Sequence, residues 1–198
     1  PLRERLCSLV EKYAPERPAL LDAGCGEGWY TSALAETVAA MGGQTAGVDL
    51  SKPAVKKAAR RCPGGEIGVA SVYHLPLEAG TVDVLSDCFS PLAAEEFYRV
   101  LKPGGIFLYV VPGPRHLWEL KRVLYENPYE NEERREEYPG FRYLEVVPVE
   151  TAFTLPSQAD IQDLFRMTPY FWKTPREGTE RLARLDALTV TGQFRIHV

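Results

Sequence analysis

The sequence predicts an α/β fold built on a doubly wound, mostly parallel sheet, and three observations lead to this prediction. Short apolar segments alternate with amphipathic segments of helical periodicity through residues 2–111. Short turns join these segments. A turn rich in glycine follows the first apolar segment, as in sheets that bind nucleotides. Strands and helices that alternate in this way specify a sheet of parallel strands.

Helices are expected where apolar residues recur at helical spacing between recognisable end signals. Residues 2–13 form the first helix, which Pro15 and Pro18 end. A second helix covers residues 30–41, and a third follows Ser51 as its N-cap, with Pro53 in the first turn. Three more are expected from Ser90 and Pro91 to about residue 101, over 116–125, and over 157–167 behind the cap Ser157.

Strands are expected at 19–22, 45–50, 66–70, 81–86, 106–111, 143–155 and 185–198. Residues 106–111 are almost continuously apolar, which is typical of a central strand. Lys102-Pro103-Gly104-Gly105 reads as the turn before that strand. Residues 126–140 are rich in charge, Asn, Tyr and Pro, and we expect a mobile surface loop there.

Composition indicates one globular domain. The chain has 198 residues, of which 45% are hydrophobic and 25% charged. It has no apolar run long enough for a membrane span, and its four cysteines form no C-x-x-C pair, so no metal site is expected. A reduced, cytoplasmic setting fits best.

Charge argues mildly against a nucleic-acid binder, because the net charge is −4. The positive charge is nevertheless clustered, and each cluster is either a binding surface or a solvated helix face. The clusters are Lys52, Lys56, Lys57, Arg60 and Arg61; Arg115, His116, Lys121 and Arg122; and Lys173, Arg176, Arg181 and Arg184.

The spacing of the glycines narrows the class of ligand that the turn could bind. Asp22 ends an apolar run, and Gly24, Gly26 and Gly28 follow at every second position before a helix begins. A dinucleotide fingerprint would need G-x-G-x-x-G, but the position three residues beyond Gly26 is Trp29. The acid-x-G-x-G-x-G form resembles the first motif of class I S-adenosylmethionine-dependent methyltransferases. A glycine turn without a ligand is the alternative.

The resemblance implies further cofactor contacts. Asp49 ends the second strand, where a carboxylate can accept hydrogen bonds from ribose hydroxyls, or can simply belong to a turn. Ser71 stands where many members of the family carry an adenine-binding Asp, before the Leu75-Pro76 pair; the alternative is an ordinary turn serine. The residues expected to contact the cofactor are Asp22, Gly24, Gly26, Gly28, Asp49, Leu50, Ala70, Ser71 and Asp87.

Three further segments resemble a narrower family, the bacterial large-subunit rRNA guanine-N1 methyltransferases. They are Phe89-Ser90-Pro91, the segment from Val111 to Lys121, and the segment from Met167 to Trp172. The resemblance implies a Rossmann-like, seven-stranded sheet with an antiparallel final pair, a 23S rRNA hairpin as partner and a homodimer. The family usually carries an N-terminal zinc module that nothing here matches, so the chain is expected to be a fragment. We expect a single methyltransferase domain: a linker helix over 1–15, a cofactor core over 16–112, and substrate-side helices and closing strands over 113–198.

Methylation at guanine N1 requires a destination for the N1 proton and surfaces that hold the exposed base. Asp87, His116 and Glu119 are the candidate proton acceptors, and Arg115 is a candidate phosphate ligand. The substrate is expected to contact Phe89, Ser90, Pro91, Arg115, His116 and Trp172, with Trp118, Tyr170 and Phe171 as further aromatic candidates.

Each of these readings has an alternative. Ser90 and Pro91 can be a helix cap and a first-turn proline. His116 can be an exposed or phosphate-contacting side chain, Glu119 a surface residue, and the Met167–Trp172 segment core packing. For the whole chain, the alternatives are a methyltransferase acting on a small molecule, such as a quinone precursor, and a cofactor-binding protein without transfer activity, such as an RNA chaperone.

Overall fold

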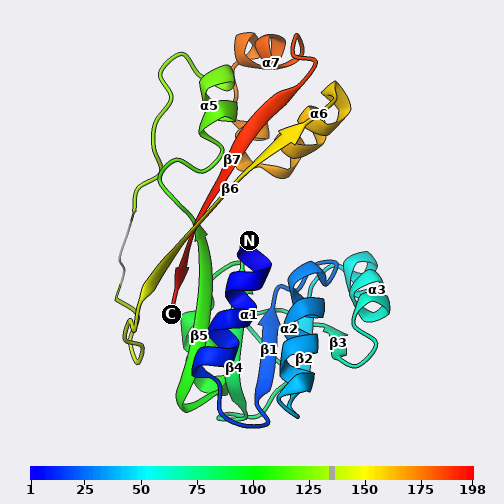
Figure 1. Ribbon diagram of the computed structural model, residues 1–198, viewed down its shortest axis with the longest axis vertical. Helices are drawn as coiled ribbons and strands as arrows, with labels where there is room; N and C mark the ends of the chain where they lie inside the picture. The colour runs from blue at the N-terminus through cyan, green and yellow to red at the C-terminus, as the bar shows by residue number, and fades with distance from the viewer. Residues whose placement is uncertain (134–136) are drawn as a thin grey trace. The chain divides into compact units, whose positions relative to one another are not determined.

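A computed structural model describes residues 1–133 and 137–198. Strands and helices alternate along the chain (Figure 1). The elements are α1 (Leu2–Tyr13), β1 (Ala19–Ala23), α2 (Trp29–Ala40), β2 (Gln44–Asp49), α3 (Lys52–Arg61), β3 (Glu66–Val69), β4 (Val82–Cys88), α4 (Ala94–Val100), β5 (Leu101–Pro112), α5 (Trp118–Leu124), β6 (Val146–Leu155), α6 (Gln158–Met167), the 3-10 helix η1 (Pro169–Trp172), α7 (Arg176–Leu182) and β7 (Leu188–His197). The expected loop over 126–140 includes residues 134–136, which lie outside the described residues.

The strands form one seven-stranded sheet in the order β3-β2-β1-β4-β5-β7-β6. Strands β3, β2, β1, β4 and β5 run parallel to their neighbours, and the final strands are antiparallel. The predicted fold class is therefore confirmed. The strand order reverses between β1 and β4, and ligands of such sheets bind at the carboxyl ends of the strands beside that point.

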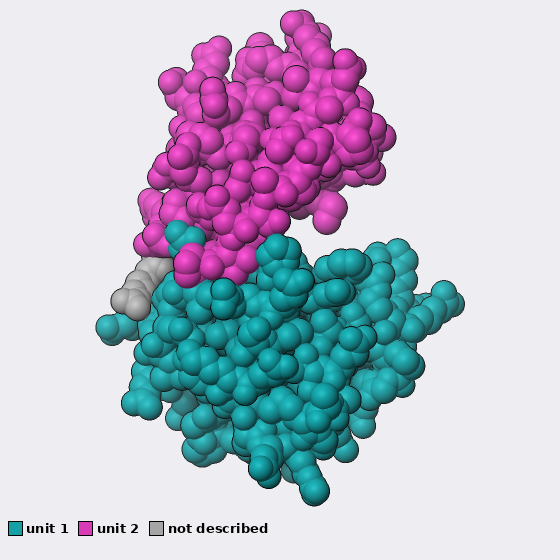
Figure 2. All heavy atoms as spheres, in the orientation of Figure 1, with its two compact units in different colours: residues 1–111, 135–147, 195–198 teal, residues 112–134, 148–194 magenta. Residues whose placement is uncertain are grey.

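The chain forms two compact units, coloured teal and magenta in Figure 2. The first comprises residues 1–111, 135–147 and 195–198, and the second comprises 112–134 and 148–194. The expected division into a linker helix, a cofactor core and a substrate side stays a prediction.

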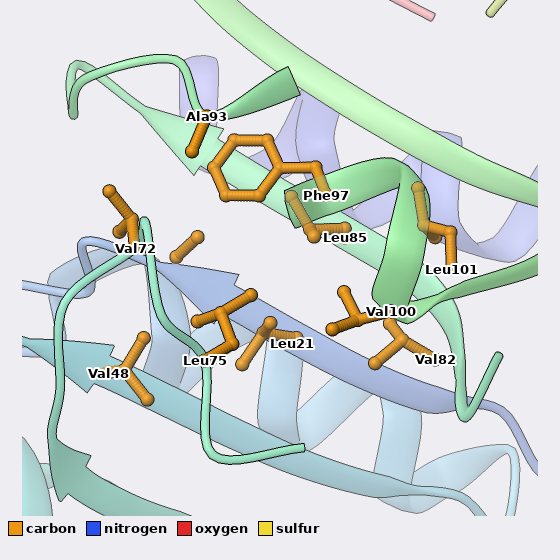
Figure 3. Close-up of a cluster of buried hydrophobic side chains, with 11 residues drawn as sticks. Leu21, Val48, Val72, Leu75, Val82, Leu85, Ala93, Phe97, Val100 and Leu101 are labelled. Atoms are coloured by element: carbon orange, nitrogen blue, oxygen red, sulfur yellow. The ribbon is translucent and has the colours of Figure 1, made fainter. Parts of the chain in front are cut away.

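One hydrophobic core cluster of the first unit lies between the sheet and α4 (Figure 3). Leu21 of β1 and Leu85 of β4 are register partners and point to this side, where Phe97 of α4 is fully buried. Truncating Phe97 to Ala would destabilise the fold by about 3–5 kcal/mol. Side chains alternate along a strand, so Asp22 and Ser86 point to the opposite face.

The second unit has its own core, formed by α5, α6, α7 and part of β7. Its buried members are Leu117, Leu120, Leu124, Ile161, Phe165, Leu182 and Val190. Ser157 accepts a hydrogen bond from the Asp160 backbone N–H, so the predicted cap of α6 is confirmed. Helix α7 and the 3-10 helix η1 had no counterpart in the prediction.

Two predicted boundaries are wrong. Helix α4 begins at Ala94 and not at Ser90, because the Ser90 hydroxyl donates to the Ala23 carbonyl instead of capping a helix. Strand β5 begins at Leu101, and the expected turn at residues 102–105 lies within it. Leu101 pairs with Val82, and the pairing register shifts beyond that point, so the Pro-Gly-Gly signal forms a bulge in the ladder.

Candidate functional site

The glycine turn after β1 is formed by left-handed backbone. Gly24, Gly26 and Gly28 have φ angles of 76°, 54° and 78°, a region that side-chain-bearing residues rarely adopt. The N–H groups of Gly24 and Cys25 donate to the carbonyl of Val48 at 2.8 and 2.9 Å, which fastens the turn to β2. The turn therefore needs glycine for its conformation.

The three glycines have different surroundings. A Cβ atom on Gly24 would lie 2.3 Å from the Cβ of Ser90, and one on Gly28 would lie 2.9 Å from the Cα of Ala58. A Cβ atom on Gly26 would meet nothing within 4 Å. Packing thus excludes side chains at the two outer glycines, and the middle one leaves bare backbone accessible to a ligand.

Asp49 lies at the carboxyl end of β2 and supports the turn directly. One carboxylate oxygen accepts from the Gly26 N–H at 3.0 Å, and the other accepts from the Ser51 N–H at 2.8 Å. Each oxygen keeps a second lone pair, so the carboxylate can also accept hydrogen bonds from vicinal hydroxyl groups. The neighbouring Leu50 is exposed, and its cofactor contact stays a prediction.

Asp22 is buried beneath the turn, on the α2 side of β1. Its two oxygens accept from the hydroxyls of Thr31, at 2.5 Å, and Ser86, at 2.7 Å. Burial raises its pKa, although both hydrogen bonds oppose that shift. Asp22 is only 2% exposed, and its expected contact with the cofactor stays a prediction.

Asp87 carries a buried oxygen atom without a partner. It lies beside Ala23 in the register of β1 and β4, next to the turn. One oxygen accepts from the Ser90 N–H at 2.9 Å, and the other has no hydrogen-bond partner among the described residues. Burial raises the pKa of Asp87 to about 6, against the opposing effect of the Ser90 hydrogen bonds. A cationic ligand group beside this carboxylate would satisfy the orphan oxygen.

The segment after β3 is hydrogen-bonded to the end of β2. The Ala70 N–H donates to the Asp49 carbonyl at 3.2 Å, which holds Ala70 and Ser71 at the ligand edge. The Ser71 hydroxyl accepts from the Tyr73 N–H at 3.2 Å, so Ser71 forms the turn that the alternative reading describes. Its expected adenine contact stays a prediction.

An ion pair on α4 holds the next residues of this segment, and the sequence analysis missed it. Glu96 accepts from the Leu75 N–H at 2.6 Å and from two nitrogens of Arg99 at 2.7 and 2.8 Å. Arg99 also donates to the carbonyls of Leu75 and Leu77. The Arg99 guanidinium lowers the pKa of Glu96 to about 2. Through these hydrogen bonds the two residues attach the Leu75–Leu77 segment to α4, the helix that covers the core.

Phe89 follows β4 in a strained conformation. Its φ angle is 69°, which is uncommon for an aromatic residue, and half of its side chain (50%) is exposed. Its ring lies 6.4 Å from that of Tyr30 between centroids. Pro91, two residues further, is exposed. Strain of this kind occurs at functional sites, and the expected role of Phe89 as a surface for a planar substrate stays a prediction.

His116 belongs to the second unit, where the backbone of β7 holds its ring. The Nδ1 atom lies 3.1 Å from the carbonyl oxygen of Gln193 and 3.3 Å from its backbone nitrogen, so the tautomer decides which contact is the hydrogen bond. Burial lowers the pKa of His116 below 6.5. The ring is therefore neutral at pH 7, as a proton acceptor must be.

Of the two other candidates in the second unit, Glu119 is occupied by structural contacts and Arg115 is exposed at the surface. Both oxygens of Glu119 accept from Thr191, one from its N–H and one from its hydroxyl, each at 2.9 Å. Glu119 thus joins α5 to β7, and these contacts leave it poorly placed to accept a substrate proton. The guanidinium of Arg115 lies over the Trp118 ring at 5.0 Å and 3.6 Å from Glu130 at the surface, where it remains accessible to a phosphate.

The Met167–Trp172 segment is only partly core. Trp172 is 83% exposed, and Met167 is exposed as well, whereas Tyr170 packs against the core of the second unit. The Phe171 ring makes edge contacts with Phe165 and Trp172. The core-packing alternative therefore holds for Tyr170 and not for Trp172, which presents a large aromatic surface.

The residues of the first unit fit S-adenosylmethionine. The open backbone at Gly26 can admit the amino-acid part, the spare lone pairs of Asp49 suit ribose hydroxyls, and the orphan oxygen of Asp87 suits an ammonium group. Among the described side chains, no three His, Cys, Asp or Glu residues are arranged to hold a metal ion. No helix in the described ranges has the length and apolarity needed to cross a membrane.

Comparisons with known proteins agree with this fit. The sequence model of the family described as "Methyltransferase domain" matches residues 21–109. A Bacillus subtilis protein, provisionally named a 23S rRNA (guanine-N1)-methyltransferase, is 32% identical over 96% of the chain and 70% of its own length. The 23S rRNA (guanine(748)-N1)-methyltransferase of Streptomyces fradiae is 36% identical over 63% of the chain and 45% of its own length.

More distant matches lie outside RNA modification. The malonyl-[acyl-carrier protein] O-methyltransferase of Serratia marcescens is 29% identical over 59% of the chain and 46% of its own length. Among solved structures, the YcgJ protein of Bacillus subtilis superposes with a TM-score of 0.59 over 98% of the chain and 97% of its own, at 16% identity. That structural likeness concerns the fold alone.

Proposed function

The chain belongs to the class I S-adenosylmethionine-dependent methyltransferases, and from this premise we propose that it methylates N1 of a guanine in a hairpin of 23S rRNA. The observation that carries the proposal is the 32% identity, over 96% of the chain, to a relative provisionally named for that reaction. The Streptomyces fradiae relative, named for guanine 748, supports the same acceptor. Because the target is ribosomal RNA, the proposed location is the cytoplasm.

The first unit would hold the cofactor. S-adenosylmethionine, when bound, supplies a methyl group on a positively charged sulfur, which makes that group electrophilic. Asp49 would accept hydrogen bonds from the ribose hydroxyls, and Asp87 would meet the ammonium group with its orphan oxygen. The glycine turn would allow the ligand to approach the backbone directly. These contacts fix the donor in one position, so the acceptor can be aligned with it.

The acceptor needs a proton destination. Guanine N1 carries a proton at neutral pH and becomes a nucleophile only when that proton leaves. We propose His116 for this role, because burial keeps its ring neutral and the Gln193 backbone orients it. Asp87 is the other candidate if its orphan oxygen faces the acceptor and not the ammonium group, and its pKa of about 6 would then let it accept a proton near neutral pH. Phe89 and Trp172 are proposed to stack on the RNA bases, and Arg115 to contact a phosphate.

The proposal is tested by incubating the purified protein with unmethylated 23S rRNA and S-adenosylmethionine that carries a labelled methyl group. A methyl group at N1 lies on the Watson–Crick edge of guanine, so reverse transcriptase should stop one nucleotide before the modified base. The matched control is Asp49→Asn, which replaces one acceptor oxygen with an NH₂ donor and removes the negative charge, and it should lower both the label and the stop in parallel. Label without a stop, or label on another base, would contradict the N1 assignment.

A small or protein-borne carboxylate is the second candidate acceptor, favoured by the likeness to the malonyl-[acyl-carrier protein] O-methyltransferase. The same labelled cofactor, offered with malonyl-acyl carrier protein and no RNA, discriminates the two. Transfer to that acceptor and to no RNA would overturn the rRNA proposal. Cofactor binding without transfer to either acceptor would favour a binding protein.

A further inference from the structure

In the first unit, two arginine side chains lie over the ring of an exposed tryptophan next to the glycine turn. Trp29 is the first residue of α2, directly after the glycine turn, and 57% of it is exposed. The guanidinium carbon of Arg3, from α1, lies 5.1 Å from the centre of its ring, and that of Arg61, from α3, lies 5.3 Å away. Both separations are within the range of cation–π attraction. The indole thus fixes two positive charges that come from distant parts of the chain.

These two charges are not neutralised by the described part of the protein. Neither Arg3 nor Arg61 forms an ion pair with any described carboxylate, and Glu27 pairs instead with Lys57. Two guanidinium groups on one ring repel each other unless an anion lies between them. A phosphate would relieve this repulsion and accept hydrogen bonds from both groups.

Helix α3 extends the same positive surface. It carries five cations and no carboxylate, in a chain whose net charge is −4. Among these cations only Lys57 has an ion-pair partner in the described chain. Val55 and Ala58 of this helix are buried, and its exposed apolar residues are only the small Pro53 and Ala59, so its outward face is mainly charged. A helix that enters a membrane surface needs an exposed apolar face, which α3 does not have.

We propose that this surface, formed by Arg3, Trp29, Arg61 and the cations of α3, binds a single-stranded segment of the RNA substrate. Arg3 and Arg61 would contact phosphates, and the exposed part of the indole would stack on a base. Because Trp29 directly follows Gly28, RNA held here would lie beside the cofactor-binding turn. The inference rests on the proposed function, since it takes RNA as the acceptor.

The test measures RNA affinity by fluorescence anisotropy with two labelled probes, a 23S rRNA hairpin transcript and a single-stranded oligoadenylate. Arg3→Gln/Arg61→Gln should weaken both complexes about tenfold and flatten the plot of log affinity against log salt by about 1–2 between roughly 50 and 200 mM salt. Trp29→Leu should weaken binding about tenfold, whereas Trp29→Phe, which keeps a stacking ring, should retain most of the affinity.

The matched control is Arg17→Gln/Arg166→Gln, which changes the net charge equally at exposed positions that do not belong to the proposed surface. All variants should bind S-adenosylhomocysteine as the unmodified protein does, which shows that they are folded. Equal losses in the control and the surface variants, or unchanged RNA affinity in the latter, would overturn the inference. Surface-dependent binding to phosphatidylserine vesicles, with no effect on either RNA, would overturn it in favour of a membrane surface.

Failure of this inference is distinguishable from failure of the proposed function. If the surface variants methylate 23S rRNA at full rate, the proposed function is supported and the proposed RNA-binding surface is overturned. If the protein binds both RNA probes through this surface but methylates no RNA, the surface is supported and the proposed function is overturned.

Discussion

The side chain of Ser90 occupies the space that a side chain on Gly24 would need. A Cβ atom on Gly24 would lie 2.3 Å from the Cβ of Ser90. Ser90 is itself fixed at two points, since its hydroxyl donates to the Ala23 carbonyl at 3.1 Å and its N–H to Asp87 at 2.9 Å. The loop after β4 therefore packs tightly against the glycine turn after β1. The same hydrogen bonds also orient the Asp87 carboxylate.

This contact predicts that Gly24→Ala and Ser90→Gly are energetically coupled. Gly24→Ala alone should destabilise the protein by more than 2 kcal/mol, because overpacking adds to backbone strain of about 1–2 kcal/mol at a positive φ. Adding Ser90→Gly removes the clash, so the double variant should lose at least about 1 kcal/mol less than the sum of the single losses. Urea unfolding of all four proteins measures the coupling, and strictly additive losses would contradict the contact.

Gly26 should respond differently from Gly24. A Cβ atom there meets no protein atom within 4 Å, so Gly26→Ala should cost only the backbone strain, about 1–2 kcal/mol. The added methyl group would project into the space proposed for the cofactor. Titration calorimetry with S-adenosylhomocysteine should show a loss of affinity of tenfold or more in a protein that still unfolds cooperatively. Unchanged affinity would show that the ligand does not approach this backbone.

The sequence was sufficient for the sheet because its signals are local. The glycine turn and the short apolar strands each occupy a few adjacent residues, and they predicted the sheet and its parallel core. Ser90 and Pro91 misled the prediction, because they carry the local pattern of a helix start while Ser90 is bound by Ala23, 67 positions away. The Lys102–Gly105 signal misled it in the same way, since pairing with β4 converts a turn into a bulge.

The features of the candidate site were likewise predictable where they depend on adjacent residues, and not where they depend on distant segments. Asp49 was predictable from its spacing to the turn, and the structure shows it supporting Gly26. The unpartnered oxygen of Asp87 depends on burial by distant segments, so no spacing rule contains it. Lys121 was read as part of a basic cluster, yet it is fully buried and donates to the Tyr129 carbonyl and to Asn131. Its surroundings come from a loop that carries no periodic pattern.

Asp87 predicts how stability depends on pH. Its pKa in the folded protein is about 6, above the ordinary value of 3.8, so folding favours the protonated form. That contribution is complete below about pH 4 and is lost as the pH rises through 6. Asp87→Asn, which stays neutral, should therefore gain stability relative to the unmodified protein between pH 4 and pH 7, by up to about 3 kcal/mol.

Thermal unfolding at several pH values measures this difference, and Asp163→Asn on the exposed face of α6 is the control. Cofactor affinity should follow the same group, because an ammonium ligand needs the ionised carboxylate. Affinity for S-adenosylhomocysteine should fall about tenfold per pH unit below 6 in the unmodified protein and stay flat in Asp87→Asn. A parallel pH dependence in both proteins would exclude Asp87 as the ammonium partner.

The Glu96–Arg99 ion pair predicts the opposite dependence of stability on pH. The pKa of Glu96 is lowered from 4.5 to about 2, so its contribution is complete above about pH 4.5 and is lost as the pH falls toward 2. Glu96→Gln should lower the stability at pH 7 by about 1 kcal/mol, a modest loss because solvent screens a pair near the surface. Chemical unfolding should show the two proteins converging below pH 4. A difference that stays constant down to pH 2 would mean that the hydrogen bond to Leu75, and not the charge, matters.

His116 and Glu119 lie on the same segment and should fail in different ways. If His116 accepts the guanine proton, His116→Gln should lower turnover on the 23S rRNA hairpin about 100-fold or more and leave cofactor affinity nearly intact. The acid limb of the turnover profile should lie below pH 6.5, because burial lowers the pKa of His116, and should disappear in the variant. Glu119→Gln should instead lower the melting temperature with little change in turnover at low temperature, since both of its oxygens accept hydrogen bonds from Thr191. Equal losses of turnover and cofactor affinity in His116→Gln would point to a folding role for that histidine and leave Asp87 as the proton acceptor.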